Sequence, residues 1–304
     1  MNAAAKVPWL ERRERGSRGA MQFMKWMALC CGRQMARLML YPICAYFLLF
    51  APRARSASRE YLACALGRPA CLADLWRHYF TFAATILDRV YFIDGRFGRF
   101  DIEVKGLELL RRTLAKGRGC ILLGAHLGSF ELLRTLAPEH RLSVSAVMYE
   151  ENAAKITGIL NAVNPEISAR TIVPGELDTV LRISECLARG EIIAMLGDRS
   201  AGSGKSVMCR FFGREAVFPQ GPLLLALSLR VPVYLVAGLY EGGKRYVIHL
   251  ESLCEEPDAD PAERAAWTRE WTQRYAERLE HFCRIAPYNW FNFYDFWSGS
   301  PGAK

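Results

Sequence analysis

The sequence predicts an α/β fold, in which a mixed sheet is flanked by helices and preceded by an apolar helical segment. From Asp101 onward, short apolar runs alternate with longer amphipathic runs, the pattern of a largely parallel sheet with crossover helices. Before that point, residues 21–50 are mostly apolar and lie between arginine-rich flanks. We therefore expect an N-terminal basic and apolar membrane-associating segment, residues 1–60, followed by one α/β domain, residues 61–304.

The N-terminal apolar segment is unlike the surface of an ordinary globular protein. Its longest uninterrupted apolar run, 38–51, is shorter than the roughly 20 residues that cross a bilayer, and it contains Pro42. Arginines on both sides and aromatic residues within it favour a helix lying in the surface of an anionic leaflet. A buried core helix is the alternative. A cleaved signal peptide is disfavoured because Glu11 and Glu14 precede the apolar run.

Within the α/β part, runs of apolar residues define the expected elements. We expect strands at 120–123, 142–149, 192–196, 207–212, 231–240 and 246–250. We expect helices at 129–136, 153–163, 176–188, 222–229 and from Pro261 to about Arg284. The sequence Asp258-Ala-Asp-Pro261 supplies N-cap residues and an early proline for the last helix.

Composition narrows the classes of function. With 51% hydrophobic and 23% charged residues, the chain has enough apolar surface for a packed core. Its net charge of +9 suits anionic lipid, an acidic carrier protein or nucleic acid, but the arginines are dispersed and no nucleic-acid motif is present. The ten cysteines form no Cys-x-x-Cys pair or zinc-binding pattern, so we expect reduced thiols, no metal and no cofactor.

A histidine follows the first strand of the α/β part. The strand Cys120–Leu123 continues into Gly124-Ala-His126-Leu-Gly-Ser-Phe-Glu131, and catalytic groups of open α/β sheets favour the carboxyl ends of strands. If His126 lies in the turn and Glu131 in the first helical turn, Glu131 can orient one ring nitrogen and leave the other basic. The sequence has no Gly-x-Ser-x-Gly nucleophile elbow, which favours direct transfer to an acceptor. Taken alone, the pair is more often a helix start and a solvated charge.

Three sequence motifs, found in order along the chain, indicate that the His126/Glu131 pair belongs to a catalytic site. The segment 124–131 resembles the His-x-x-x-x-Asp/Glu signature of the lysophospholipid acyltransferase superfamily, in the form of its lipid A late acyltransferase branch. Met195-Leu-Gly-Asp198-Arg199 resembles the strand-end acidic motif of that branch. Phe211-Phe-Gly213, Pro219-Gln-Gly221 and Val231-Pro-Val233 resemble its next block, and the likeness extends from about Met21 to Trp297.

The resemblance implies a glycerolipid-acyltransferase-like fold and an O-acyltransferase. His126 would be the general base and Glu131 its partner, and Asp198 and Arg199 would lie at the same pocket rim, although an Asp-Arg strand end can also be a surface turn. The donor would be an acyl thioester on acyl carrier protein or coenzyme A, and the acceptor a lipid hydroxyl. We expect the protein at the cytoplasmic face of the bacterial inner membrane, peripheral or anchored by its N-terminus.

Two departures from the branch bear on the acceptor. Val173-Pro174-Gly175 stands where a basic residue is usual, and the chain end, 287–297, is aromatic rather than strongly basic. A phosphorylated acceptor needs fixed cations, so the acceptor can be a less anionic lipid, a glycolipid or a polyene-like molecule. The aromatic end either lines an acyl or polyene groove or packs on the core as an anchoring flap.

The remaining features leave alternatives open. Residues 202–206 form a Gly-rich loop without the first glycine of a phosphate loop; Lys205, Arg210 and Gly213 are candidate substrate-binding residues that could meet an acidic carrier or a phosphopantetheine phosphate. A hairpin turn is the plainer interpretation. Two other functions compete with acyl transfer: a non-catalytic lipid-binding scaffold of the same fold, and a lipid or thioester hydrolase.

Overall fold

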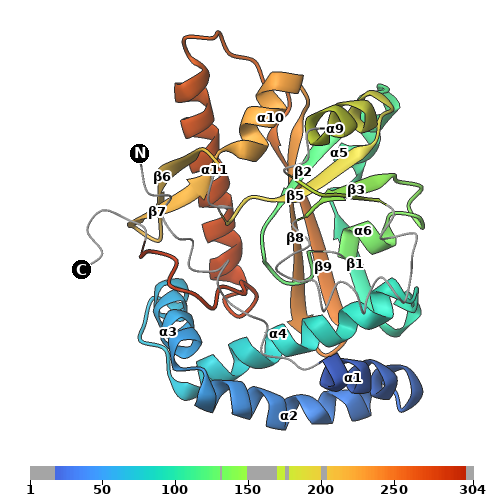
Figure 1. Ribbon diagram of the computed structural model, residues 1–304, viewed down its shortest axis with the longest axis vertical. Coiled ribbons are helices and arrows are strands. Elements are labelled where there is room, and N and C mark those ends of the chain that lie inside the picture. Colours follow the sequence, from blue (N-terminus) through green and yellow to red (C-terminus); the bar gives the residue numbers. More distant parts are fainter. Residues whose placement is uncertain (1–17, 131, 149–169, 175–177, 200–203, 299–304) are drawn as a thin grey trace.

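The computed structural model describes residues 18–130, 132–148, 170–174, 178–199 and 204–298. Its centre is a seven-stranded sheet in the order β1-β9-β8-β2-β5-β3-β4, beside which lies the two-stranded sheet β6-β7 (Figure 1). Strands β8, β2, β5, β3 and β4 are mutually parallel, whereas β9 pairs antiparallel with β8 and parallel with β1. The mixed α/β fold expected from the sequence is therefore confirmed.

All six expected strands are present; the strand 192–196 has the expected ends, and the other five have shifted ends. They are β2 (Cys120–Gly124), β3 (Val144–Val147), β5 (Ile192–Leu196), β6 (Ser206–Phe211), β8 (Val233–Gly242) and β9 (Arg245–Cys254). The sequence analysis missed three others, which are β1 (Asp101–Lys105), β4 (Thr171–Ile172) and β7 (Arg214–Pro219). Strands β1 and β4 are the edges of the large sheet, and β7 has charged residues at its start, so none of them has the long apolar run by which the others were found.

The helices of the α/β part agree less closely with expectation. They are α5 (Leu107–Ala115), α6 (Leu132–Leu136), α9 (Thr179–Ala188), α10 (Gly221–Leu229) and α11 (Arg264–Ile285). Helix α5 was not expected, and α11 begins after Glu263 instead of at Pro261, without a side-chain cap. The helix expected at 153–163 lies outside the described residues.

Strand β2 runs through the centre of the molecule and is buried along its whole length. Because side chains alternate along a strand, Ile121 and Leu123 pack into the core under α11 and β6-β7, whereas Cys120 and Leu122 pack into the core under α4 and α6. A strand that is covered on both faces has a continuous run of apolar residues in its sequence, and for this reason the sequence predicted β2 well.

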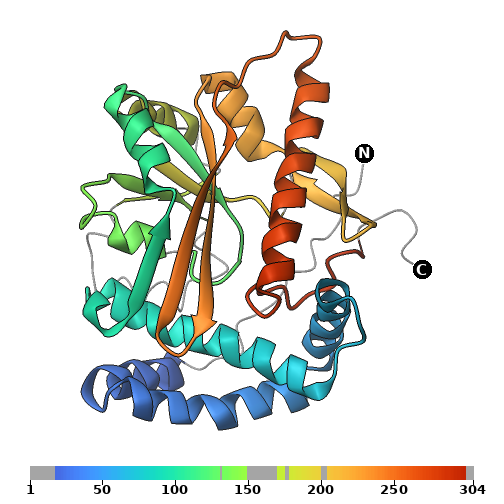
Figure 2. The ribbon, with the colours of Figure 1, turned by 180° about the vertical axis from the view of Figure 1, so that it is seen from behind.

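The N-terminal part consists of four helices, α1 (Arg18–Cys30), α2 (Arg33–Phe50), α3 (Pro52–Leu66) and α4 (Leu72–Ile93). Helix α4 lies across one end of the sheet, and α1 and α2 lie below α4 (Figures 1 and 2). Helix α3 continues without a break past residue 60, where we placed the boundary of the N-terminal segment.

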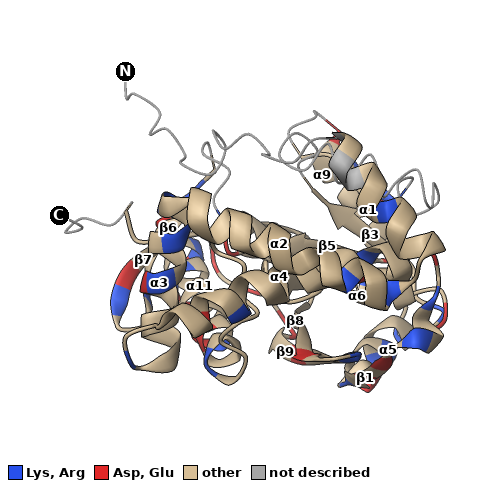
Figure 3. Ribbon diagram, turned by 90° about the horizontal axis from the view of Figure 1, so that it is seen from below, with Lys and Arg blue, Asp and Glu red and all other residues tan. Residues whose placement is uncertain are grey.

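Helix α2 has two unlike faces. Ala36, Leu40 and Cys44 are buried, whereas the opposite side of α2 and neighbouring turns expose large apolar side chains: Phe23, Trp26, Met35, Leu38, Tyr41, Tyr46, Leu49, Phe50 and Leu72. We call this set the apolar underside. Seen from below, the second half of α2 lacks charged residues (Figure 3). Helix α2 thus packs on the core with one face and exposes apolar side chains on the other, and its placement in a membrane surface stays a prediction.

No single helix in the described ranges has the length and hydropathy of a membrane span. The pair α2 and α3 meets the criterion only when taken together, and the two helices are bent by 96° at their junction.

A buried ion pair fixes α2 to the core. Arg33 donates two hydrogen bonds to the carboxylate of Asp88 on α4, at 2.6 and 2.7 Å, and Tyr246 of β9 donates a third at 2.8 Å. Asp88 has no exposed surface. A buried carboxylate without its partner is costly, by about 3 kcal/mol, so this pair sets where α2 lies on α4.

Candidate functional site

The site lies where two neighbouring parallel strands end. The register of β2 and β5 pairs Gly124 with Leu196. His126 and Asp198 therefore each lie two residues beyond a paired position, at the same carboxyl edge of the sheet. This is the edge at which open α/β sheets place their functional groups.

Strand register brings His126 and Asp198 into contact. His126 Nδ1 lies 2.9 Å from Asp198 Oδ1, and the backbone N–H of His126 donates to Asp198 Oδ2 at 3.1 Å. Because an ionised carboxylate can only accept, Nδ1 carries the proton and Nε2 keeps its lone pair. The side chain of His126 is 27% exposed, so a substrate can reach the imidazole ring that carries Nε2.

A third donor reaches the same carboxylate from the chain end. The indole Nε1 of Trp290 donates to Asp198 Oδ2 at 3.0 Å, and both Asp198 and Trp290 are fully buried. Three hydrogen bonds satisfy a carboxylate that has no access to water. This burial excludes the interpretation of Asp198-Arg199 as a self-paired surface turn.

The electrostatics of the pair favour a charged Asp198 beside a neutral His126. Burial opposes ionisation of Asp198, but His126, its hydrogen bonds and Arg199 together lower the pKa of the carboxyl below its usual value. Withdrawal from solvent, followed by the charge of Arg199, lowers the pKa of His126 from its ordinary 6.5, although Asp198 acts in the opposite direction. At neutral pH, His126 is thus an unprotonated base.

Backbone hydrogen bonds fix the loop that carries His126. Phe291 N donates to His126 O, Gly128 N to Asn289 O, and the N–H of residue 129 to Gly238 O, all at 2.7 to 2.8 Å. Gly128 has φ of +59°, and a Cβ there would lie 2.1 Å from the carbonyl oxygen of Gly238. Only glycine fits at this position, because L residues avoid this φ and backbone already occupies the space.

The aromatic chain end packs on the core, as one of the two interpretations expected. Trp290 and Trp297 are buried, and Trp290 packs against Tyr61 of α3 with ring centroids 4.9 Å apart. His78 of α4 donates from Nε2 to the Trp290 carbonyl at 2.8 Å and accepts from Ser58 at 2.7 Å. Through these contacts α3 and α4 position Trp290, whose indole donates a hydrogen bond to Asp198.

Arg199 and an aromatic ring lie near His126. Arg199, whose charge acts on the His126 ring, donates from Nη2 to Phe291 O at 2.8 Å, and its buried Nε has no hydrogen-bond partner among the described residues. The ring of Phe130 lies 5.8 Å from the His126 ring, and the buried guanidinium of Arg89 lies 5.4 Å above the Phe130 ring. The surroundings of His126 are therefore positively charged through Arg199 and partly aromatic.

The structure brings some of the expected site residues together and not others. His126, Asp198 and Arg199 form one group, whereas Glu131 lies outside the described residues, so its contact with His126 stays a prediction. Arg210 is an exposed residue of β6, and Gly213 forms the tight turn between β6 and β7 with φ of +74°. Lys205 is exposed just before β6. Within the described part, no hydrogen bond or ion pair joins these three to His126.

The sequence analysis missed Trp290, Asn289 and Gly128 as site residues. Trp290 and Asn289 were seen only as part of an aromatic tail, because nothing in their spacing connects them to a strand end 92 residues earlier. Gly128 could have been predicted from the sequence, since a glycine inside a catalytic signature commonly marks a backbone conformation that requires glycine. Among the described residues, no three His, Cys, Asp or Glu are grouped as a metal site would need.

A bacterial family model matches nearly the whole chain. The family model described as bacterial lipid A biosynthesis acyltransferase matches residues 22–298, nearly the whole chain. No curated protein matches the chain at the level that would count as a relative.

Protonation of His78 should govern part of the pH dependence of stability. Burial lowers the pKa of His78 from 6.5 to about 4. The unfolded chain therefore binds this proton more tightly than the folded protein, and the free energy of unfolding falls as pH drops from 6.5 toward 4, by up to about 3 kcal/mol. In His78→Gln, urea unfolding midpoints measured at pH 7 and pH 4.5 should differ less than in the wild type. His281→Gln, at an exposed position, should keep the full difference. An unchanged difference in the His78 variant would contradict this assignment.

Proposed function

Since the chain belongs to the bacterial lipid A biosynthesis acyltransferase family, and is thus an acyltransferase that acts on a lipid acceptor, we propose that it transfers a fatty acyl group from a thioester to a hydroxyl with His126 as general base. The observation that carries this proposal is the His126–Asp198 contact at the carboxyl edge of the sheet. It fixes the tautomer that leaves Nε2 free to accept a proton.

The proposed reaction is a direct transfer. His126 Nε2 takes the proton of the acceptor hydroxyl while the hydroxyl oxygen attacks the thioester carbonyl carbon. The carbonyl π electrons move to its oxygen, and when the carbonyl re-forms the C–S bond breaks. The thiolate leaves and takes the proton from His126. Asp198 stabilises the transient imidazolium, in the way that a buried carboxylate does in a catalytic triad. The products are an ester and a free thiol.

Arg199 is proposed to stabilise the oxyanion. Its Nε–H is buried and has no acceptor within the described residues, while Nη2 is anchored on Phe291 O. An unsatisfied charged donor beside the base fits a group that meets a negative oxygen only during the reaction. Glu131, which follows His126 at the family spacing, is proposed as a further partner of the base.

The donor is proposed to be acyl carrier protein or acyl-coenzyme A. Lys205, just before β6, and Arg210 of β6 are exposed cations, and each suits an acidic carrier or a phosphopantetheine phosphate. Gly213 would belong to this region through the turn that it makes.

The acceptor is proposed to be a lipid, glycolipid or polyene-like molecule with a free hydroxyl. Arg199 and the ring of Phe130 lie near His126, so the site suits an amphipathic acceptor that carries some negative charge. The sequence departures near Val173 favour an acceptor with less negative charge than a phosphorylated one.

We further propose that the protein binds the cytoplasmic face of the inner membrane peripherally, through the apolar underside. Scattered exposed apolar residues are ordinary, but here nine large ones lie on neighbouring helices, along α1, α2 and the start of α4. Arginines at 53, 55 and 59 follow this surface directly and suit anionic headgroups.

Removal of either member of the pair should abolish transfer without unfolding the protein. His126→Gln removes the base, and Asp198→Asn removes the charge that orients it and stabilises its protonated form. Acyl transfer should fall about 100- to 10,000-fold in each. Mass spectrometry of lipids from cells that express each variant at matched levels would show whether a species heavier by one acyl chain is lost.

The exposed residues His281 and Asp258 provide matched controls, and their amide variants should retain transfer. Undiminished transfer in His126→Gln would reject the mechanism. Release of free fatty acid by the wild type in the absence of any acceptor would indicate a hydrolase instead.

The pH profile should report the lowered pKa of His126. Because the unprotonated ring is the active form, transfer should fall on the acid side through a pKa below 6.5. Initial rates of acyl transfer between pH 5 and 8 measure this limb directly. An acid limb that lies above pH 6.5 would contradict the described electrostatics of the pair.

Membrane binding should depend on the apolar underside. Met35 and Leu38 are 53% and 58% exposed on the same face of α2, and replacing both by serine should lower partitioning onto anionic vesicles at least tenfold. Vesicle flotation measures the partitioning. Val180→Ser with Leu181→Ser, an equally exposed pair on α9 at the far side of the molecule, should leave it unchanged (Figure 1). Equal partitioning of both double variants would refute docking through this surface.

A further inference from the structure

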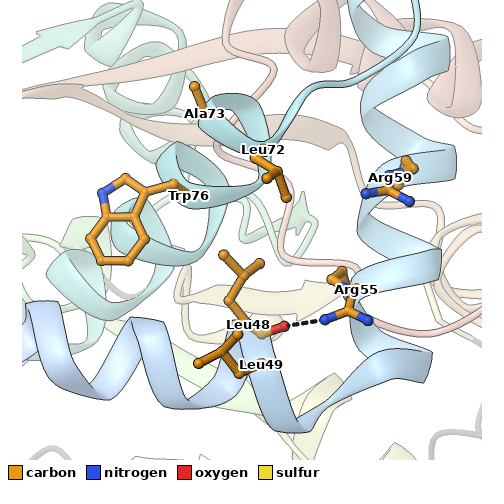
Figure 4. A pocket seen from close by; sticks show the side chains of 7 residues that line it. All are labelled: Leu48, Leu49, Arg55, Arg59, Leu72, Ala73 and Trp76. Carbon is orange, nitrogen blue, oxygen red and sulfur yellow. Dashed lines mark hydrogen bonds between the residues drawn. The ribbon is translucent and has the colours of Figure 1, made fainter.

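An open pocket lies where α2 bends into α3. It has a volume of about 510 Å³ and is lined by Leu48, Leu49, Arg55, Arg59, Leu72, Ala73 and Trp76 (Figure 4). We call it the bend pocket. In Figure 4 the two arginines of α3 lie on one side, and Leu72 of α4 and Leu48 of α2 lie opposite them. The size falls within the range of small-molecule sites.

The bend pocket is separate from the site at His126. On α3, Arg55 and Arg59 face outward, whereas Ser58 and Tyr61 are buried against His78 and Trp290. On α4, Leu72 and Ala73 are exposed. The two helices thus stand between the bend pocket and the residues that hold Asp198, so an occupant of this pocket is not the reacting acceptor.

The charge at the bend pocket is uncompensated. Arg55 uses one N–H on the Leu48 carbonyl at 2.7 Å, which leaves other donors of its guanidinium, and Arg59 is exposed without a hydrogen bond or ion pair among the described residues. The acidic residues of these helices are engaged elsewhere: Glu60 with Arg214 and Asp74 with Arg68. Two cations over an apolar floor complement an anionic headgroup above an acyl chain.

The bend pocket is also continuous with the apolar underside. Leu49 and Leu72, both 65% exposed, belong to the underside and to the pocket lining. A protein docked through this surface would bring the bend pocket to the depth of the headgroups and the first methylenes of the leaflet. The available occupant at that depth is a lipid of the same leaflet.

We propose that the bend pocket binds a single anionic phospholipid of the bilayer, with its phosphate on Arg55 and Arg59 and the start of an acyl chain on Leu48, Leu72 and Trp76. This inference rests on the proposed membrane association but not on the proposed chemistry. The pocket gives the protein a preference for anionic lipid that general adsorption through the apolar underside does not supply.

Trp76 provides the test. Its fluorescence, taken as the difference between the full-length wild type and Trp76→Phe, is measured on two vesicle preparations of the same composition, phosphatidylcholine with a minority of phosphatidylglycerol. In one, bromine is carried only on the phosphatidylglycerol chains; in the other, only on the phosphatidylcholine chains. We expect brominated phosphatidylglycerol to quench Trp76 by more than its share of the bilayer.

Two variants show whether the arginines cause the preference. Arg59→Gln, and Arg55→Gln with Arg59→Gln, should reduce quenching by phosphatidylglycerol to its share of the bilayer. Arg111→Gln with Arg112→Gln on α5 makes the same change of charge at exposed positions and should keep the preference. Arg59 has no hydrogen-bond or ion-pair partner among the residues that the structure describes, so its single variant tests the site without removing a contact of α3.

Flotation of the same samples separates this proposal from membrane docking. If the protein floats with vesicles but both brominated lipids quench Trp76 in proportion to their amounts, or neither quenches it, the lipid site is refuted and docking stands. If the protein does not float, both are refuted. Because no acyl donor is present, the outcome is independent of transfer, and His126→Gln should behave as the wild type does.

Discussion

The organisation of this protein depends on one buried carboxylate. Asp198 has no exposed surface, and it accepts hydrogen bonds from the ring and the backbone of His126 and from the indole of Trp290. A buried charge is tolerated only when it is fully paired. The ends of β2 and β5 and the aromatic chain end must therefore meet at this point, and the ring of His126 is oriented by the same contacts that satisfy the charge.

The loop around His126 is held by backbone contacts that leave no room for side chains. Gly128 and Gly238 approach each other closely, and Asn289 bonds both Gly128 and the backbone of Tyr240. Such contacts fix the ring position before any substrate binds, which is what an electrostatically preorganised site requires. The aromatic chain end is thus part of the site's framework, although its rings pack into the core.

Helices α3 and α4 contribute both to the packing around Trp290 and to the bend pocket. Their inner faces hold Trp290 through His78, Ser58 and Tyr61, and their outer faces form the bend pocket beside the apolar underside. The Arg33–Asp88 pair fixes α2 beneath them. Because the packed helices cannot shift without breaking buried polar contacts, this layer keeps a constant distance between His126 and the apolar underside.

The sequence by itself determined the α/β fold, six strands recognised by their largely apolar runs, and His126, Asp198 and Arg199 as candidate site residues, because buried strands and short motifs leave local patterns. It did not reveal the edge strands, whose side chains are half solvated, or α5. Only the tertiary structure showed that His126 and Asp198 pair directly, since that follows from the register of β2 against β5, and that Trp290 completes the carboxylate. The contact of His126 with Asp198 spans 72 positions in the sequence, and that of Asp198 with Trp290 spans 92. Such contacts depend on how the strands and the chain end pack, which no local sequence pattern encodes.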